Sequence, residues 1–228
     1  MRQAALARLR FHQTRRGAPG FSLIEMLIGS AIFVVVLLAI YIIVDTSRAD
    51  YAMGAAKADV QENMRVALES MARELRMAGY APSNSPNANC AVPPCGVTAL
   101  TASAVTFQAD IVGTTQTDNV AYRFVAATNP TKPCDSSDST TVGTIKRSVQ
   151  FWDTVAVAWN PADPTANEFD VAQCVKAVTI TYRDSTGAVT AVAANVRRIT
   201  ISITGEENAR GQTARTYALA TDVWLRNL

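Results

Sequence analysis

Histidine is almost absent from this chain. The only one is His12, so no imidazole is available beyond that position for acid–base catalysis near neutral pH. The sequence also has no phosphate-binding loop and no nucleophile elbow, and no two of its acids are placed as a convincing catalytic pair. These absences predict a protein that is not an enzyme and uses no cofactor.

Acidic residues are missing from the first 24 positions, and charge of either sign is missing from residues 26–44. The first 20 residues are instead rich in arginine: Arg2, Arg8, Arg10, Arg15 and Arg16. Beyond this basic leader, the chain holds more acidic than basic side chains. The formal net charge of +2 therefore does not indicate a nucleic-acid partner.

The uncharged run from Met26 to Val44 is long enough to cross a bilayer, which takes roughly 20 helical residues. Glu25 lies at its N-terminal end, where a buried acid is costly and suggests a function. Basic residues that flank an apolar segment stay in the cytoplasm, so the C-terminal portion is expected outside it. An ordinary secretory signal would be cut after its apolar region, among small residues. An uncleaved single-pass anchor is the alternative.

A second helical pattern follows the apolar run. Small and apolar residues recur at spacings of three and four, with charged residues between them, at Val60, Met64, Ala67, Met71, Leu75 and Ala78. Gly79 and Pro82 then supply a stop signal. The pattern predicts one helix over about 21–79, roughly 90 Å long, with an apolar first half and an amphipathic second half. Two separate helices, with a bend at Gly54, are the alternative.

Beyond a break at residues 81–96, the pattern changes to strands. Alternating apolar and polar residues predict strands at 104–108, 120–125, 142–152, 175–182, 196–203 and 217–225. A polar loop is expected at 205–212. The predicted fold is therefore α+β, with a long N-terminal helix packed on an antiparallel sheet.

Four cysteines lie on the side of the apolar run that is expected to be exported: Cys90, Cys95, Cys134 and Cys174. An even number in an oxidising compartment indicates two disulfides. Of three possible pairings, Cys90–Cys95 with Cys134–Cys174 is preferred. Zinc binding is the alternative, but two cysteines four residues apart without a nearby histidine do not match zinc spacing. Asp135 and Asp138 alone do not define a calcium site, so no metal is predicted.

The order of basic leader, Gly20, Phe21, Glu25 and apolar helix resembles the class III signal of type IV prepilins and pseudopilins. This resemblance implies that a prepilin peptidase cuts between Gly20 and Phe21 and methylates the new N-terminus of Phe21. A side chain at position 20 should obstruct the close approach of the peptidase to the backbone. Glu25 would then pair with the free amine of Phe21, on the same or an adjacent subunit, and set the register of assembly.

Two further segments narrow the resemblance. Gln61–Leu68 and Glu74–Tyr80, together with the ending Leu225-Arg226-Asn227, are similar to PilW-type minor pilins, although Ala81-Pro82 stands where a Gly-Cys pair often follows the helix. The resemblance implies a pilin-like fold and an inner-membrane subunit that primes or caps type IV pilus assembly. Its partners would be the prepilin peptidase, other minor pilins, the major pilin and the pilus assembly platform.

The resemblance also implies a domain organisation. Residues 1–20 would be the cleaved leader, 21–44 the membrane and assembly half of the helix, 45–80 its amphipathic half, and 81–228 a periplasmic β-rich domain. Two alternatives remain open: a GspJ-like pseudopilin of a type II secretion tip complex, and a pilus-tip adhesin or DNA-binding subunit. Arg197 and Arg198 are expected on opposite faces of a strand, so they form no basic patch for DNA.

Overall fold

The computed structural model describes residues 20–80, 96–113, 116–126, 142–153, 155–156, 158–207 and 215–227. Its α-helix is α1 (Leu23–Leu75), and it has a short 3₁₀-helix, η2 (Ala193–Asn195). The strands are β1 (Val97–Leu100), β2 (Ala104–Ala109), β3 (Asp118–Ala126), β4 (Gly143–Asp153), β5 (Ala158–Asn160), β6 (Phe169–Arg183), β7 (Arg198–Glu207) and β8 (Arg215–Trp224). The chain separates into two compact units after Arg48.

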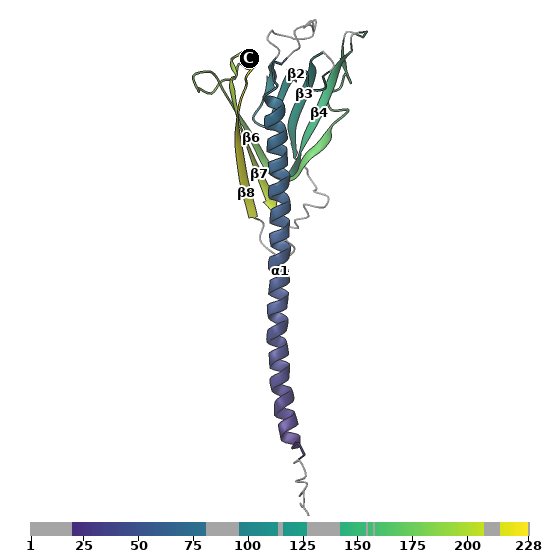
Figure 1. Ribbon diagram of the computed structural model, residues 1–228, viewed down its shortest axis with the longest axis vertical. Coiled ribbons are helices and arrows are strands. Elements are labelled where there is room, and N and C mark those ends of the chain that lie inside the picture. Colours follow the sequence, from purple (N-terminus) through teal and green to yellow (C-terminus); the bar gives the residue numbers. More distant parts are fainter. Residues whose placement is uncertain are drawn as a thin grey trace, which may run out of the picture. The chain divides into compact units, whose positions relative to one another are not determined.

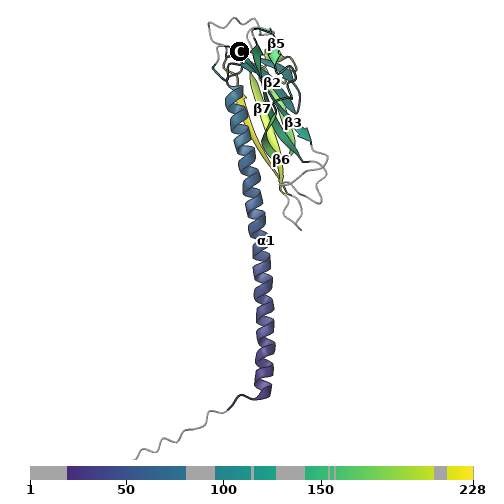
Figure 2. The same cartoon turned by 90° about the vertical axis from the view of Figure 1, so that its right-hand side faces the viewer.

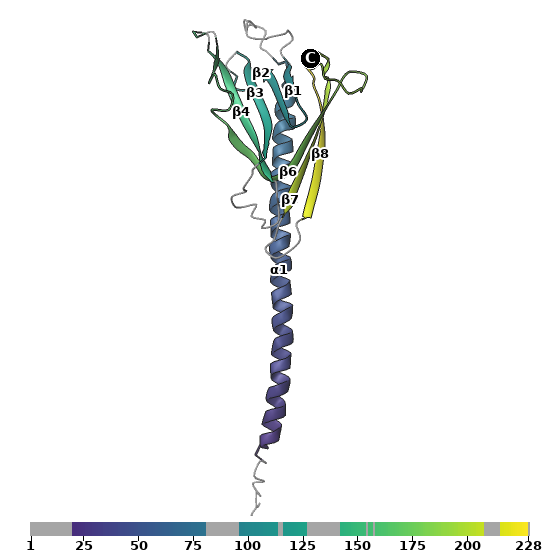
Figure 3. The same ribbon diagram turned by 180° about the vertical axis from the view of Figure 1, so that it is seen from behind.

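The predicted α+β fold is confirmed: one long N-terminal helix and an eight-stranded antiparallel sheet. The strand order is β1-β2-β3-β4-β6-β7-β8, and β5 pairs with the end of β4. Within the second unit, the C-terminal part of α1 lies along one face of the sheet (Figure 2). In Figure 1, β2, β3 and β4 are seen to one side of the helix and β6, β7 and β8 to the other. β1 and β8 are therefore the two end strands of the pairing order, and Figure 3 shows both from behind.

The helix ends because its last turns tighten and bond to the sheet. Met77 and Ala78 donate backbone hydrogen bonds three residues back, at 2.9 and 3.0 Å. Gly79 then adopts φ 81°, the left-handed conformation that commonly closes a helix. Its amide donates to the carbonyl of Gln108 in β2 at 3.0 Å. The predicted stop at Gly79 thus coincides with the point where the chain joins the sheet.

The amphipathic stripe of α1 forms the core with the inner face of the sheet. The six residues of the predicted stripe are buried, five of them within α1 and Ala78 just beyond its end, and Leu68 and Ala72 are buried with them. From the sheet they meet alternating residues of the central strands, among them Val105, Phe107, Val120, Ile199, Ile201 and Ile203, all 0% exposed. Burial of these side chains is the main force that holds the last turns of α1 to the sheet.

Gly205 lets the helix approach the sheet closely. A Cβ added there would lie 2.6 Å from Val60 Cγ1 and 2.7 Å from the Met64 sulfur, both on α1. The prediction of a loop beginning at Gly205 is wrong, because β7 continues to Glu207. Glycine lacks a side chain for an inward position of the strand, and this is what leaves room for Met64.

Strand β6 begins at Phe169, six residues before its predicted start. Its first half carries polar residues such as Asp170 and Gln173, which obscure the alternation of a strand. The pairing with β4 also shifts register between Ala172 and Val175. Cys174 lies in this irregularity with φ 59°, a left-handed conformation that is uncommon for residues other than glycine.

Candidate functional site

Gly20 and Phe21 precede α1 and are fully accessible. Phe21 is 83% exposed, and a Cβ built on Gly20 would meet no atom within 4 Å. Nothing within the described chain therefore requires glycine at position 20. A requirement for glycine here would have to come from a partner that approaches the Gly20–Phe21 bond.

Glu25 closes the N-terminus of α1. The backbone N–H of Ser22 donates to Glu25 Oε2 at 3.2 Å, and the first helical bond runs from Met26 N–H to the Ser22 carbonyl. Ser22 thus holds the N-cap position, and Glu25, three residues later, reaches back to it as in a capping box. Sequence reasoning assigned Glu25 to assembly alone and missed this contact, although the Ser-x-x-Glu spacing indicates it.

The apolar half of α1 is exposed on all sides of the helix. All residues from Phe21 to Val44 are exposed, including bulky side chains such as Phe33 at 61% and Ile43 at 63%. The helix is long and apolar enough to cross a membrane. Such a surface is stable only against lipid or other apolar helices, because water would impose the full hydrophobic cost.

Polar groups within and just beyond this stretch bond to the helix itself. The Ser30 hydroxyl donates to the Leu27 carbonyl at 2.9 Å, and the Ser47 hydroxyl donates to the Ile43 carbonyl at 2.7 Å. Such back-bonding hides hydroxyls from an apolar surrounding. Glu25 is the one ionisable side chain other than the Tyr41 phenol between Phe21 and Val44.

A buried polar cluster joins the last full turn of α1 to β3 and β4. Glu74, only 8% exposed, accepts hydrogen bonds at Oε2 from the Tyr122 hydroxyl at 2.7 Å and from Arg147 Nε at 2.9 Å. Burial raises the pKa of the Tyr122 phenol well above its ordinary value, which keeps the hydroxyl protonated. Burial acts to lower the pKa of Arg147, but the hydrogen bond and charge of Glu74 outweigh it, so that pKa is raised.

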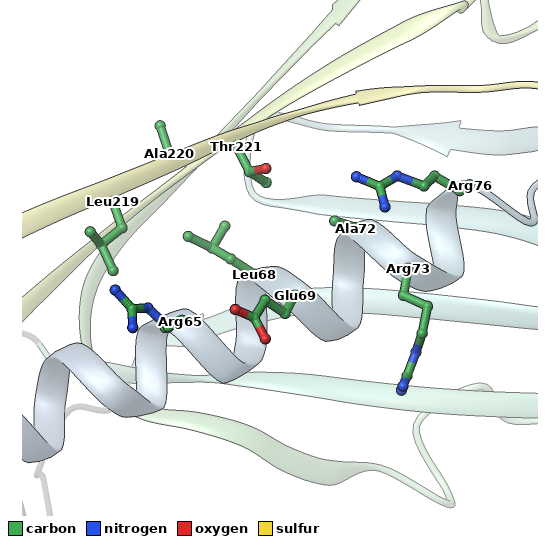
Figure 4. A pocket seen from close by; sticks show the side chains of 9 residues that line it. All are labelled: Arg65, Leu68, Glu69, Ala72, Arg73, Arg76, Leu219, Ala220 and Thr221. Carbon is green, nitrogen blue, oxygen red and sulfur yellow. The ribbon is translucent and has the colours of Figure 1, made fainter.

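A second surface feature is an open groove of about 450 Å³ between α1 and β8. Its helix side carries Arg65, Glu69, Arg73 and Arg76, and its strand side carries Leu219, Ala220 and Thr221, with Leu68 and Ala72 between them (Figure 4). Sequence reasoning treated these arginines only as the charged face of the helix. The groove depends on β8 lying beside that face, which helix periodicity alone does not reveal.

The remaining predicted residues form no common site in the described part. Cys174 is buried, whereas Cys90, Cys95 and Cys134, like Asp135 and Asp138, lie outside the described residues, so both disulfides stay predictions. Arg198 pairs with Asp222, while Arg197 donates to the carbonyls of Ala194 and Val196. Within the described ranges, no group of three or more histidine, cysteine or acidic side chains is placed to hold a metal.

Comparison with known families places this geometry in context. Residues 15–41 match the prokaryotic N-terminal methylation motif, which covers the Gly20–Phe21 bond, Glu25 and most of the apolar run. No curated protein matches the chain. The motif suggests a structural, non-enzymatic subunit that is processed by prepilin peptidase and associates with other pilins. The motif and the exposed apolar helix indicate a type IV pilin-like protein.

Proposed function

We propose that the chain is a PilW-type minor pilin, which primes or caps type IV pilus assembly after cleavage of residues 1–20 and methylation of Phe21. The observation that carries the proposal is the fully exposed apolar surface of residues 26–44 with one carboxylate, Glu25, at its start. A subunit with this surface can leave the bilayer only by exchanging lipid for neighbouring apolar helices. A filament core supplies such neighbours.

The basic leader gives the proposed orientation. Its arginines would stay in the cytoplasm, residues 21–44 would span the inner membrane, and the rest of the chain would lie in the periplasm. There the part of the helix that packs on the sheet, from Val60 onward, would stay docked on the β-rich domain. The disulfides predicted for the four cysteines fit this oxidising compartment.

Glu25 is proposed to set the register between subunits. In a dry filament core its carboxylate would need a cationic partner, and cleavage creates one at the amine of Phe21. A buried ion pair adds little net stability, but a displaced subunit would leave a buried charge unpaired, at a cost of several kcal/mol. The pair would thus select one axial position.

The positions of the two segments that resemble PilW-type pilins support the proposal of a minor pilin. In Gln61–Leu68 the buried residues are Met64, Ala67 and Leu68, and in Glu74–Tyr80 the buried Glu74 bonds to Tyr122 and Arg147. The segments that resemble PilW-type pilins are therefore those that dock the helix on the sheet. A GspJ-like pseudopilin is the second candidate, because the N-terminal motif is common to both classes. Neighbouring genes for minor pilins would favour the first, and genes for secretion components the second.

Two substitutions at Glu25 test the proposal in piliated cells that express the tagged full chain. Glu25→Gln keeps an oxygen acceptor for the Ser22 N–H, as glutamine does in capping boxes, but removes the charge. Glu25→Val removes both. We expect both variants to be cleaved and methylated, as mass spectrometry of the N-terminus would show. Both should be strongly depleted from sheared filaments compared with the wild-type chain.

The matched control is Glu62→Gln, an exposed acid farther along the same helix, which should assemble normally. Normal incorporation of Glu25→Gln with failure of Glu25→Val would reduce Glu25 to a helix cap. Normal piliation with both variants would overturn the proposed register role.

A further inference from the structure

On its helix side, the groove between α1 and β8 is lined by three arginines, Arg65, Arg73 and Arg76, and by one acid, Glu69. Arg65, Arg73 and Arg76 are all exposed, and within the described residues none of them forms an ion pair. By contrast, the sheet arginines Arg123, Arg147 and Arg198 each pair with a carboxylate. The uncompensated charge of the groove therefore attracts an anionic partner.

The spacing of these arginines forms one stripe. Arg65, Glu69, Arg73 and Arg76 follow one another at intervals of four, four and three residues, which places them on the same helical face. From Arg65 to Arg76 the stripe extends about 16 Å along the helix axis. Glu69 interrupts it near the middle, so an acidic partner has two favourable zones separated by an unfavourable one.

The other wall of the groove is the edge of the sheet. β8 pairs with β7 over its full length without a register shift, and no described strand pairs with its second edge. Arg215–Trp224 contains no proline, lysine or bulge, and its two charged residues, Arg215 and Asp222, lie toward its ends, so the stretch between them carries no charge that would oppose further pairing. Ala218 and Ala220 are exposed, and their small side chains leave access to the strand.

We propose that an extended, acidic polypeptide segment of another subunit adds to β8 as a further strand. Its backbone would bond to the free edge of β8, and its carboxylates would meet Arg65 at one end and Arg73 with Arg76 at the other. Same-face residues of a strand recur about every 6.6 Å, so carboxylates at the first and fifth positions span about 13 Å, close to the length of the stripe. An uncharged residue between them would face Glu69. This strand addition is distinct from the contacts of the apolar helix, and it supplies sequence selectivity that apolar packing lacks.

The test uses the purified full chain in detergent micelles and fluorescein-labelled synthetic peptides. The first probe is an eleven-residue threonine- and valine-rich peptide with glutamates four residues apart on one face. A second peptide has lysine in place of glutamate. A third keeps the glutamates but has prolines at alternate positions, which removes backbone donors and prevents strand pairing. Fluorescence anisotropy gives the affinity of each.

We expect the first peptide to bind more tightly than the other two by about tenfold or more. Arg73→Glu and Arg76→Glu should each weaken that binding by about tenfold or more, whereas Arg48→Glu, the same change elsewhere on α1, should not. Glu69→Gln should strengthen it several-fold. Circular dichroism of each variant confirms that the sheet is intact.

Three outcomes would overturn the proposal. Equal binding of the proline peptide would show charge attraction without strand addition. Equal effects of Arg48→Glu and Arg73→Glu would show that the groove is not the site. Binding of an oligothymidylate, with dependence on Arg73 and Arg76 and no binding of the acidic peptide, would assign the groove to nucleic acid instead.

Discussion

Replacing either of two glycines in the second unit by alanine is expected to change stability in opposite directions. Gly205 lies against Val60 and Met64, whereas a Cβ on Gly54 would meet no atom within 4 Å. We expect Gly205→Ala to destabilise the chain by about 1–3 kcal/mol, because the added methyl overpacks the helix–sheet contact. Gly54→Ala should stabilise it by about 0.5–1 kcal/mol, because alanine restricts the unfolded chain in an exposed helix. Thermal unfolding of both variants measures the two signs.

A cavity-making change tests the cause of the Gly205 effect. If overpacking against Met64 is responsible, Gly205→Ala should cost less when it is made in a Met64→Ala background than in the wild-type chain. Equal costs in the two backgrounds would show that contact with Met64 does not destabilise the variant.

Two buried tyrosines make stability depend on alkaline pH. Burial raises the pKa of Tyr122 and of Tyr182 above the ordinary value of about 10. A group whose pKa is higher in the folded state contributes stability that is fully present below its unfolded pKa. That contribution is lost as pH rises above about 10. Denaturant unfolding between pH 9 and 11 should show this decline, and Tyr122→Phe should reduce its slope. An unchanged slope in both Tyr122→Phe and Tyr182→Phe would contradict the assignment.

At the scale of elements, periodicity predicted the helix and those strands in which apolar residues lie on one face. The stripe of α1 and the alternation of β2, β3, β4, β7 and β8 could be recognised in the sequence because one face of each is buried or half-buried. The short β1 and β5 gave no pattern, since three or four residues hold too few alternations. The start of β6 could not be recognised because polar residues such as Asp170 and Gln173 obscure its alternation. Asp170, for example, forms an ion pair with Lys146 on β4.

Only part of the candidate site could be recognised from the sequence. Gly20, Phe21 and Glu25 stand out in one dimension because charge, glycine and an apolar run succeed one another along the chain. The Glu74–Tyr122–Arg147 cluster brings together residues 48 and 73 positions apart. Only the docking of α1 on β3 and β4 reveals it, because no local pattern records a pairing between distant segments.

The buried Glu74–Tyr122–Arg147 cluster, which joins α1 to the sheet, is expected to be sensitive to the loss of one charge. Arg147→Met leaves the buried Glu74 without its cation and should cost about 3–5 kcal/mol. The double variant Arg147→Met with Glu74→Leu removes both charges and should recover most of that loss. The matched control is Lys146→Met, next along β4, whose partner Asp170 is exposed, so its loss should cost about 1 kcal/mol or less. Urea unfolding compares the variants. Equal costs at positions 146 and 147 would show that the buried pair does not hold the helix.

At the scale of the whole molecule, the proposed cleavage after Gly20 would change both the net charge of the chain and its N-terminal group. It would remove the five leader arginines and convert the amide of Phe21 into an amine four residues before Glu25. In the uncleaved chain Glu25 accepts a hydrogen bond from the Ser22 N–H. The new cation would arise next to that contact, so the proposed register role would link processing to assembly through the same carboxylate.

Replacing Gly20 with leucine should keep the chain in its precursor form. A Cβ on residue 20 meets no atom of the described residues within 4 Å, so the second unit should unfold at the same temperature as in the wild type. Mass spectrometry should find the leader retained and no methyl group on Phe21, and immunoblots of sheared filaments should find the variant absent. Gly54→Leu, also in open space, serves as the control and should be processed normally. A mature, methylated Gly20→Leu chain would place the cleavage site elsewhere. A precursor that still enters filaments would show that the amine of Phe21 is not needed by Glu25.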